Sequence, residues 1–170
     1  MSMLITAVDL ISRFLFLLAI LITAALVFIV TYDVGARNLG LTPPNWAVNT
    51  VEYGMLHITF LALPWLVRTR GHVCVELVLT YLPARARTAW ELALHAISAL
   101  ICFYLAYRSG LSLADTIAKG SYEVRSFDMP MWMLFASMPA GFLLGGLQFV
   151  AFPLRGDSFF AGAAAEKGGL

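Results

Sequence analysis

Two titratable side chains interrupt an apolar stretch of the sequence and are the first candidates for chemistry. Glu52 and His57 lie five residues apart within the run 46–67, which is otherwise almost free of charge. An ionised carboxylate at the centre of a bilayer costs about 2.5–3.5 kcal/mol, so Glu52 is expected to have a partner or a function. Arg37 and His57 are the candidate partners within the chain. A polar contact with another subunit, or an ion path, is the functional alternative.

Histidines raise the possibility of haem ligation. His57 and His95 lie on neighbouring apolar runs, and histidines serve as axial ligands to haem iron. Their depths differ, because His57 falls in the middle of its run and His95 near the beginning of the next. A single histidine in such a helix more often has a hydrogen-bonded structural role.

Other catalytic signals are absent from the sequence. We find no pairing of a nucleophile with a base, no metal-binding pattern and no phosphate-binding glycine loop. The chain is therefore predicted not to be an enzyme, and neither a cofactor nor a metal is expected.

The composition places these residues in a membrane. Of the 170 residues, 61% are hydrophobic and 12% are charged, whereas an average soluble domain has about 25% charged residues. The formal net charge is +1 without a basic block, so no nucleic-acid partner is expected. These values predict an integral membrane protein.

Four apolar segments are long enough to cross a bilayer as helices, which takes about 20 residues. The expected spans are about 12–33, 46–67, 88–108 and 129–152, in one membrane domain over 1–155. The first span has an acidic residue before a long apolar core, which favours a retained helix over a signal peptide. The remaining residues, 156–170, are rich in Gly and Ala and are expected to form a flexible tail. The predicted fold class is an all-α integral membrane protein with four transmembrane helices.

The connection between the second and third spans contains an amphipathic segment. Residues 71–82 are mostly apolar but too few to cross a bilayer, so a short interfacial helix is predicted there. Three arginines around it are expected at the lipid headgroups: Arg70, Arg85 and Arg87.

On the other side, the connection between the third and fourth spans also has helical character. The third span is expected to continue as a helix out of the membrane until Gly120 and Ser121 end it. Asp128 is expected to cap the N-terminus of the fourth helix, with Pro130 in its first turn.

The placement of Lys and Arg predicts the orientation, because short cytoplasmic loops carry the excess. With four spans, seven of these residues lie on the side of the termini and four on the other side. Both termini are therefore predicted to be cytoplasmic.

Small residues predict a packing seam on the fourth span. Ser137, Gly141 and Gly145 recur every four residues and form one stripe, and such stripes allow helix backbones to approach closely in membranes. The stripe serves either packing within the chain or docking of another membrane protein. Pro64 and Pro139 would kink their helices unless neighbours satisfy the freed carbonyls.

The segment "RTRGHVCVELVLTYLPARAR" over 68–87 resembles the signature of the small membrane subunit of tripartite ATP-independent periplasmic (TRAP) transporters, the DctQ-like family. The motifs before and after this segment also follow the order seen in the family. One departure is Val51, which precedes Glu52 where the family often carries a pair of Glu residues. The family-motif or partner-contact candidates, taken from this resemblance and from the small-residue stripe, are Arg37, Trp46, Glu52, Arg68, His72, Glu76, Pro130, Trp132, Gly141 and Gly145.

This resemblance implies a subunit of a bacterial inner-membrane complex. Its partners would be a large permease subunit, which holds the substrate and sodium sites, a periplasmic substrate-binding protein, and the membrane lipids. Uptake of an organic anion would be driven by an ion gradient, and the small subunit would brace the large one.

Two other functions are compatible with four apolar spans. One is a haem- or quinone-associated membrane anchor of a respiratory complex, and the other is an autonomous small transporter. The second is disfavoured because secondary carriers are usually built from repeats with interrupted helices, and no repeat is detectable.

Overall fold

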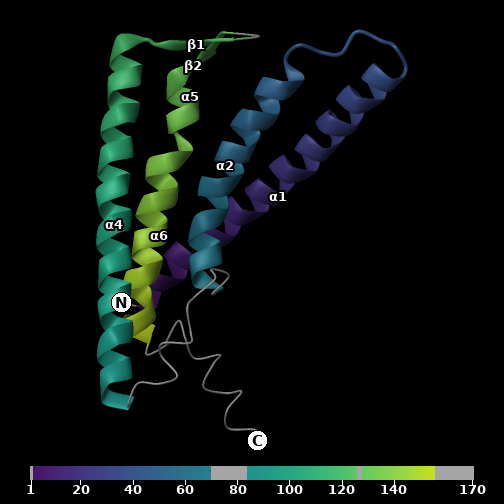
Figure 1. Ribbon diagram of the computed structural model, residues 1–170. Coiled ribbons are helices and arrows are strands. Elements are labelled where there is room, and N and C mark those ends of the chain that lie inside the picture. The colour runs from purple at the N-terminus through teal and green to yellow at the C-terminus, as the bar shows by residue number, and fades with distance from the viewer. Residues whose placement is uncertain (1, 70–83, 126–127, 156–170) are drawn as a thin grey trace, which may run out of the picture.

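The computed structural model describes residues 2–69, 84–125 and 128–155 (Figure 1). Four segments within these ranges are long and apolar enough to cross a membrane, which confirms the predicted all-α membrane fold with four spans. The helices are α1 (Ser2–Asn38), α2 (Ala47–Arg68), α4 (Ala84–Lys119), α5 (Met131–Phe135) and α6 (Ser137–Arg155).

Several predictions fall outside the described residues. These are the interfacial helix over 71–82, with Arg70, His72 and Glu76, and the tail over 156–170. Arg85 and Arg87 lie in the first turn of α4.

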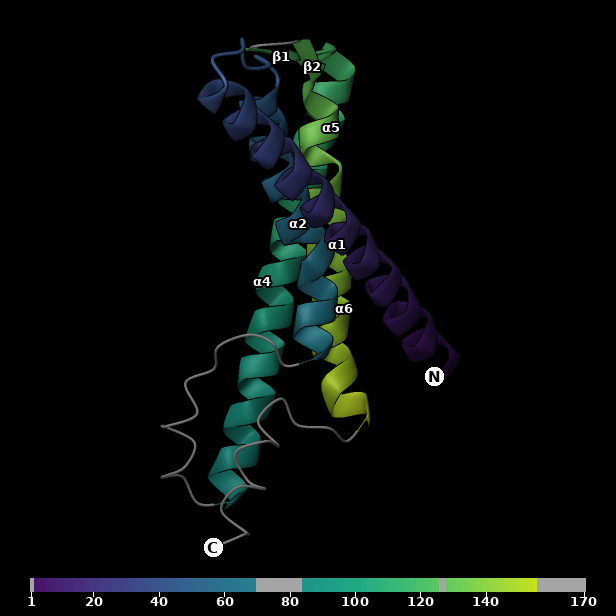
Figure 2. The same cartoon turned by 90° about the vertical axis from the view of Figure 1, so that its right-hand side faces the viewer.

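The spanning helices form a row. Helix α1 packs against α2, α2 against α6, and α6 against α4, so α1 and α4 lie at opposite ends of the row (Figure 1). Figure 2 shows that α1 crosses its neighbours at a steep angle, and its N-terminal part reaches the lower half of α6. Side chains of α1 therefore meet side chains of both α2 and α6 at that end.

Two helices are longer than a bilayer requires. Helix α1 has 37 residues and α4 has 36, which at 1.5 Å per residue gives each a length of about 55 Å, compared with about 30 Å for the hydrocarbon core. The expected extension of the third span is confirmed, since α4 continues to Lys119. It ends at Gly120, whose φ of 57° is in the left-handed region that favours glycine.

A short antiparallel pair of strands, which the sequence analysis did not predict, connects α4 to α5. Strand β1 (Tyr122–Val124) pairs with β2 (Asp128–Pro130). The prediction that Asp128 caps the fourth helix is therefore wrong, because its backbone belongs to β2. Helix α5 instead begins after Pro130, without a side-chain cap.

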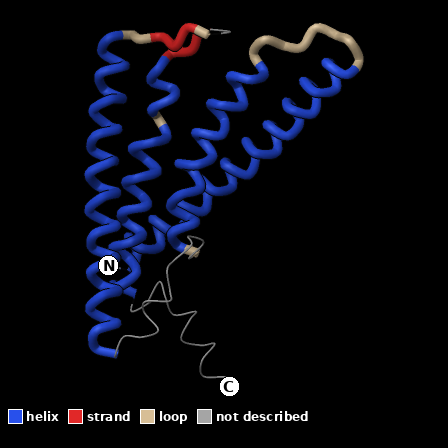
Figure 3. The backbone as a smooth tube through the Cα atoms, viewed as in Figure 1, coloured by secondary structure: helices blue, strands red, loops and turns tan. Residues whose placement is uncertain are grey.

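The fourth span is interrupted, as the sequence predicted from Pro139. Helix α5 ends at Phe135, and α6 begins at Ser137 after a turn at Ala136. Pro139 has no N–H to offer the carbonyl of Phe135, and its ring clashes with that carbonyl in a regular helix. The interruption appears at this position in Figure 3.

The contact between α2 and α6 combines a proline with a glycine. Pro64 lies inside α2 and cannot donate to the carbonyl of Phe60, four residues earlier. A methyl group added to Gly141 would overlap this Phe60 carbonyl. Glycine at 141 therefore allows the backbone of α6 to lie directly against the carbonyl that Pro64 leaves without its helical donor.

Candidate functional site

A cluster of polar side chains joins three helices at the end of the molecule near the N-terminus. Asp9 of α1 accepts hydrogen bonds from Arg155 Nη2 at 2.6 Å and Gln148 Nε2 at 2.9 Å, both on α6. Arg68, the last residue of α2, donates to the same carboxylate through Nε at 3.3 Å. We call Asp9, Ser12, Arg68, Gln148 and Arg155 the Asp9 cluster.

The centre of the Asp9 cluster is sealed from the surroundings. Gln148 and Ser12 are both 0% exposed, and Gln148 Nε2 also lies 3.1 Å from Ser12 Oγ. Ser12 in turn donates to the carbonyl of Val8 at 2.7 Å. Buried polar groups are costly unless they are hydrogen-bonded, and here the carboxylate, the amide and the hydroxyl satisfy one another.

The charges in this cluster suit a structural lock. One carboxylate faces two arginines, and the side chains of Asp9 and Arg155 are 29% and 12% exposed. Charge-assisted hydrogen bonds of this kind are shorter and stronger than neutral ones. The arrangement fixes the tilt of α1 relative to α2 and α6.

Sequence reasoning did not identify this cluster, although it had a signal. Gln148 is the only amide side chain in the uncharged run 129–154, and Arg155 follows it two helical turns later. A buried amide in such a run requires a partner, and Asp9 with Ser12, one turn apart on the first helix, supplies it. The long separation in sequence concealed the pairing.

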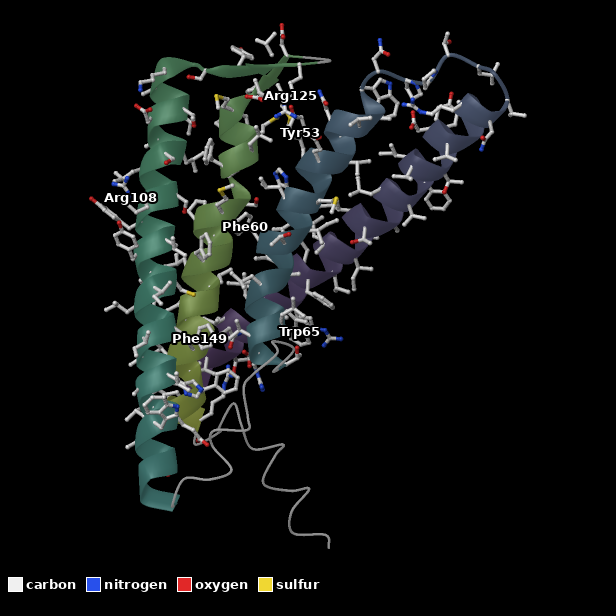
Figure 4. The ribbon with its side chains drawn as sticks, viewed as in Figure 1. Tyr53, Phe60, Trp65, Arg108, Arg125 and Phe149 are labelled. Carbon is white, nitrogen blue, oxygen red and sulfur yellow. The ribbon has the colours of Figure 1, made fainter. Side chains whose placement is uncertain are left out.

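At the opposite end of the molecule, Arg125 forms a second polar group. Its Nη1 donates to Glu52 Oε2 at 2.6 Å and its Nε to Glu123 Oε1 at 2.9 Å. Arg125 follows β1 and reaches the upper part of α2, near Tyr53 (Figure 4). The hydrogen bond with Glu123 and the charge of Glu52 raise the pKa of Arg125 above its ordinary value, so the guanidinium stays charged.

This contact corrects the expected partner of Glu52. Arg37 pairs instead with Asp33 on its own helix, at 2.9 Å, and His57 binds backbone carbonyls. Glu52 and Arg125 have 52% and 48% exposed side chains, so neither ion is sealed within the protein. The pair links the β1–β2 connection to α2.

His57 bridges two helices through its imidazole ring. Its Nδ1 lies 2.8 Å from the carbonyl of Tyr53, and its Nε2 lies 3.0 Å from the carbonyl of Met133. Met133 precedes the interruption of the fourth span. Both ring nitrogens are therefore within hydrogen-bond distance of backbone carbonyl oxygens. To bind a haem iron, one of the nitrogens would have to lose its carbonyl contact.

His95 also binds its own helix, with Nδ1 at 2.6 Å from the carbonyl of Glu91. Its ring lies 5.4 Å from the ring of Phe152 between centroids. His57 thus contacts α5, at Met133, whereas His95 contacts α6, at Phe152. In the described ranges no group of three His, Cys, Asp or Glu side chains is arranged to hold a metal ion.

The small-residue stripe packs within the chain. Ser137, Gly141 and Gly145 are all buried in α6. A methyl group added to Gly145 would make ordinary contact with Leu63 of α2, at 3.4 Å, unlike the overlap at Gly141. The neighbouring Gly146, absent from the predicted set, lies against Phe103 and Cys102 of α4.

The remaining candidates are spread over the molecule. Trp46 is 46% exposed at the beginning of α2, and Trp132 is 42% exposed in α5. Pro130 pairs with Tyr122 in the strand ladder. The structure thus brings Arg68 into the Asp9 cluster and Glu52 to Arg125, and leaves Arg37, Trp46 and Trp132 on the surface.

Comparison with known proteins adds the family. Residues 26–157 match the family model described as "Tripartite ATP-independent periplasmic transporters, DctQ component". The ectoine TRAP transporter small permease protein TeaB of Halomonas elongata is 25% identical over 96 residues, which are 56% of this chain and 49% of TeaB. The chain therefore matches about half the length of this curated relative. Because the family model covers more than half of the chain, the chain belongs to the DctQ family, the small permease components of TRAP transporters.

Proposed function

We propose that this chain braces the large permease subunit of its transporter and takes no part in the chemistry of transport. In this proposal a sodium gradient drives uptake of an organic anion, which a periplasmic binding protein delivers to the large subunit. Membership in the DctQ family and four apolar helices support a multi-pass subunit of the inner membrane. Both termini are proposed to be cytoplasmic.

The arrangement of the helices in a row is the observation that carries the proposal. A row has two broad faces and two ends but no central space between four helices, where a substrate path would run. The ionised groups described above bind one another across helices, as in the Asp9 cluster, or at the ends of the spans. A rigid apolar layer of this kind suits a brace.

The outer face of α4 is the proposed contact with the large permease. Leu100, Tyr104 and Tyr107 recur along one side of α4 and are 71%, 61% and 65% exposed. Arg108 is also exposed and points away from α6 (Figure 4). Tyrosine and arginine are enriched in protein interfaces.

Transport measurements test the accessory role. Vesicles that contain this chain alone should show no uptake of organic anions along an inward sodium gradient. Vesicles with the large permease alone should also fail, and both subunits with the binding protein should restore uptake. Uptake by this chain alone would contradict the proposal.

A photo-crosslinker tests the proposed face. Placed at Tyr104, it should give a crosslink to the large permease in membranes. The matched control is Leu21 of α1, which is 66% exposed at the other end of the row and should crosslink only to lipid. Crosslinks from Leu21 and none from Tyr104 would assign the brace to α1 instead.

A further inference from the structure

We propose that a pocket between α1 and α2 binds the headgroup phosphate of an anionic phospholipid. The pocket has a volume of about 460 Å³, and its lining includes Leu10, Arg13, Trp65 and Arg68 beside the carboxylate of Asp9. We call it the Arg13 pocket. The inference goes beyond the bracing role, because it requires only that the chain lies in a membrane.

The charge around the pocket favours an anion. Asp9 is matched by Arg155, which binds it at 2.6 Å. Arg68 also contacts Asp9, at 3.3 Å, so three arginines in and beside the pocket share one carboxylate and leave a net surplus of two positive charges. Arg13 is exposed and makes no ion pair within the described part of the chain, and the side chain of Arg68 is 34% exposed. Arginine presents several N–H donors in a planar group that matches phosphate oxygens.

The depth of the pocket matches the headgroup level. Helix α2 ends at Arg68, and the uncharged run of α1 begins at Phe14, directly after Arg13. Trp65 lies one turn before Arg68 and stacks on Phe16, with ring centroids 6.0 Å apart. Tryptophan is enriched at this boundary between hydrocarbon and water.

The surroundings of the pocket are suited to acyl chains. Phe14, Leu17 and Leu21, which follow Arg13 toward the membrane interior, are 65%, 51% and 66% exposed along α1. A phosphate at Arg13 would thus have its chains beside an apolar helix surface. This combination of surplus positive charge and adjacent apolar surface selects a lipid over a free anion.

Lipid binding to the full chain, purified in detergent, tests the inference. Dioleoylphosphatidylglycerol should bind and raise the melting temperature, whereas dioleoylphosphatidylcholine should have a much smaller effect. In the variant Arg13→Gln, the affinity for phosphatidylglycerol should fall about fivefold, as expected for one basic residue near an anionic surface. Native mass spectrometry measures the bound lipid.

Matched controls separate the alternatives. Lys119→Gln removes one positive charge at the far end of α4, where Lys119 pairs with exposed Asp115, and should bind phosphatidylglycerol as the unaltered chain does. Arg13 forms no ion pair with the residues that the structure describes and is exposed, so Arg13→Gln should melt at the same temperature without lipid. Equal affinity in Arg13→Gln, equal stabilisation by phosphatidylcholine, or equal stabilisation by inorganic phosphate alone would each overturn the inference.

Discussion

Asp9 lies a few residues from the N-terminus, yet it joins the first, second and last spanning helices. Its carboxylate is the common acceptor for Arg68, Gln148 and Arg155. The sequence predicted the residue types near each helix end but not this pairing, since a side chain three helices away leaves no local pattern. For the same reason Glu52 was assigned to Arg37 or His57, which are near in sequence, whereas its partner is Arg125.

The variant Asp9→Asn should destabilise the chain by about 1–3 kcal/mol. It removes the counter-charge of Arg155, and breaking a fully buried pair costs about 3–5 kcal/mol. The 29% exposure of Asp9 reduces that value. Thermal unfolding in detergent measures the change. The control Asp115→Asn breaks an exposed pair with Lys119 and should cost about 0.5 kcal/mol or less. Equal losses in both variants would show that the Asp9 cluster is no lock.

The variant His57→Leu should also lower stability, by about 1–3 kcal/mol, because the imidazole contacts with the carbonyls of Tyr53 and Met133 are lost. The control Thr59→Val removes an exposed hydroxyl that binds only its own helix, and should stay within about 0.5 kcal/mol.

The unaltered protein purified from haem-replete cells should show no Soret absorbance. A Soret band that His57→Leu abolishes would favour the haem-associated anchor instead.

At the scale of the elements, the spans themselves were predictable from apolar length, and so was the continuation of α4 to Lys119. The strand pair was not, because three-residue strands carry too little alternation to be detected. The stripe of small residues on α6 was predictable as a seam. The sequence did not predict that Gly141 lies closer to α2 than Gly145 does. This closer approach brings Gly141 against the Phe60 carbonyl, which Pro64 leaves without its helical donor.

Alanine substitutions along the stripe should therefore differ. Gly141→Ala should destabilise the chain by about 1–3 kcal/mol, because its methyl group overlaps the Phe60 carbonyl and forces the backbones apart. Gly145→Ala has ordinary contact distance to Leu63 and should be neutral or more stable by up to about 1 kcal/mol. Chemical denaturation compares the two variants. A larger loss at Gly145 would contradict the close approach at Gly141.

The whole molecule is a row of helices with two long members. Composition predicted the membrane but not the row, since four apolar helices also form closed bundles. The row arises because α6 lies between α2 and α4 and contacts each of them through buried glycines. This leaves α1 and α4 with large apolar surfaces open to lipid or to another subunit.

The orientation of this row remains a prediction, from seven Lys and Arg residues on one side against four on the other. A fluorescent protein fused to the C-terminus should fluoresce in cells, and alkaline phosphatase fused there should be inactive. The same phosphatase inserted in the connection over 39–45 should be active. Phosphatase activity at the C-terminus would reverse the proposed topology.

The Asp9 cluster also has a consequence for biogenesis. Asp9 and Gln148 are 139 residues apart, so a ribosome that adds 5–20 residues per second makes the second about 7–28 s after the first. During that interval α1 and α2 have left the translation channel, and Asp9 and Arg68 form the one ion pair between them in the described part of the chain. The arrival of α6 then completes the cluster, so a chain truncated before Gln148 should remain open to quality-control proteases in the membrane.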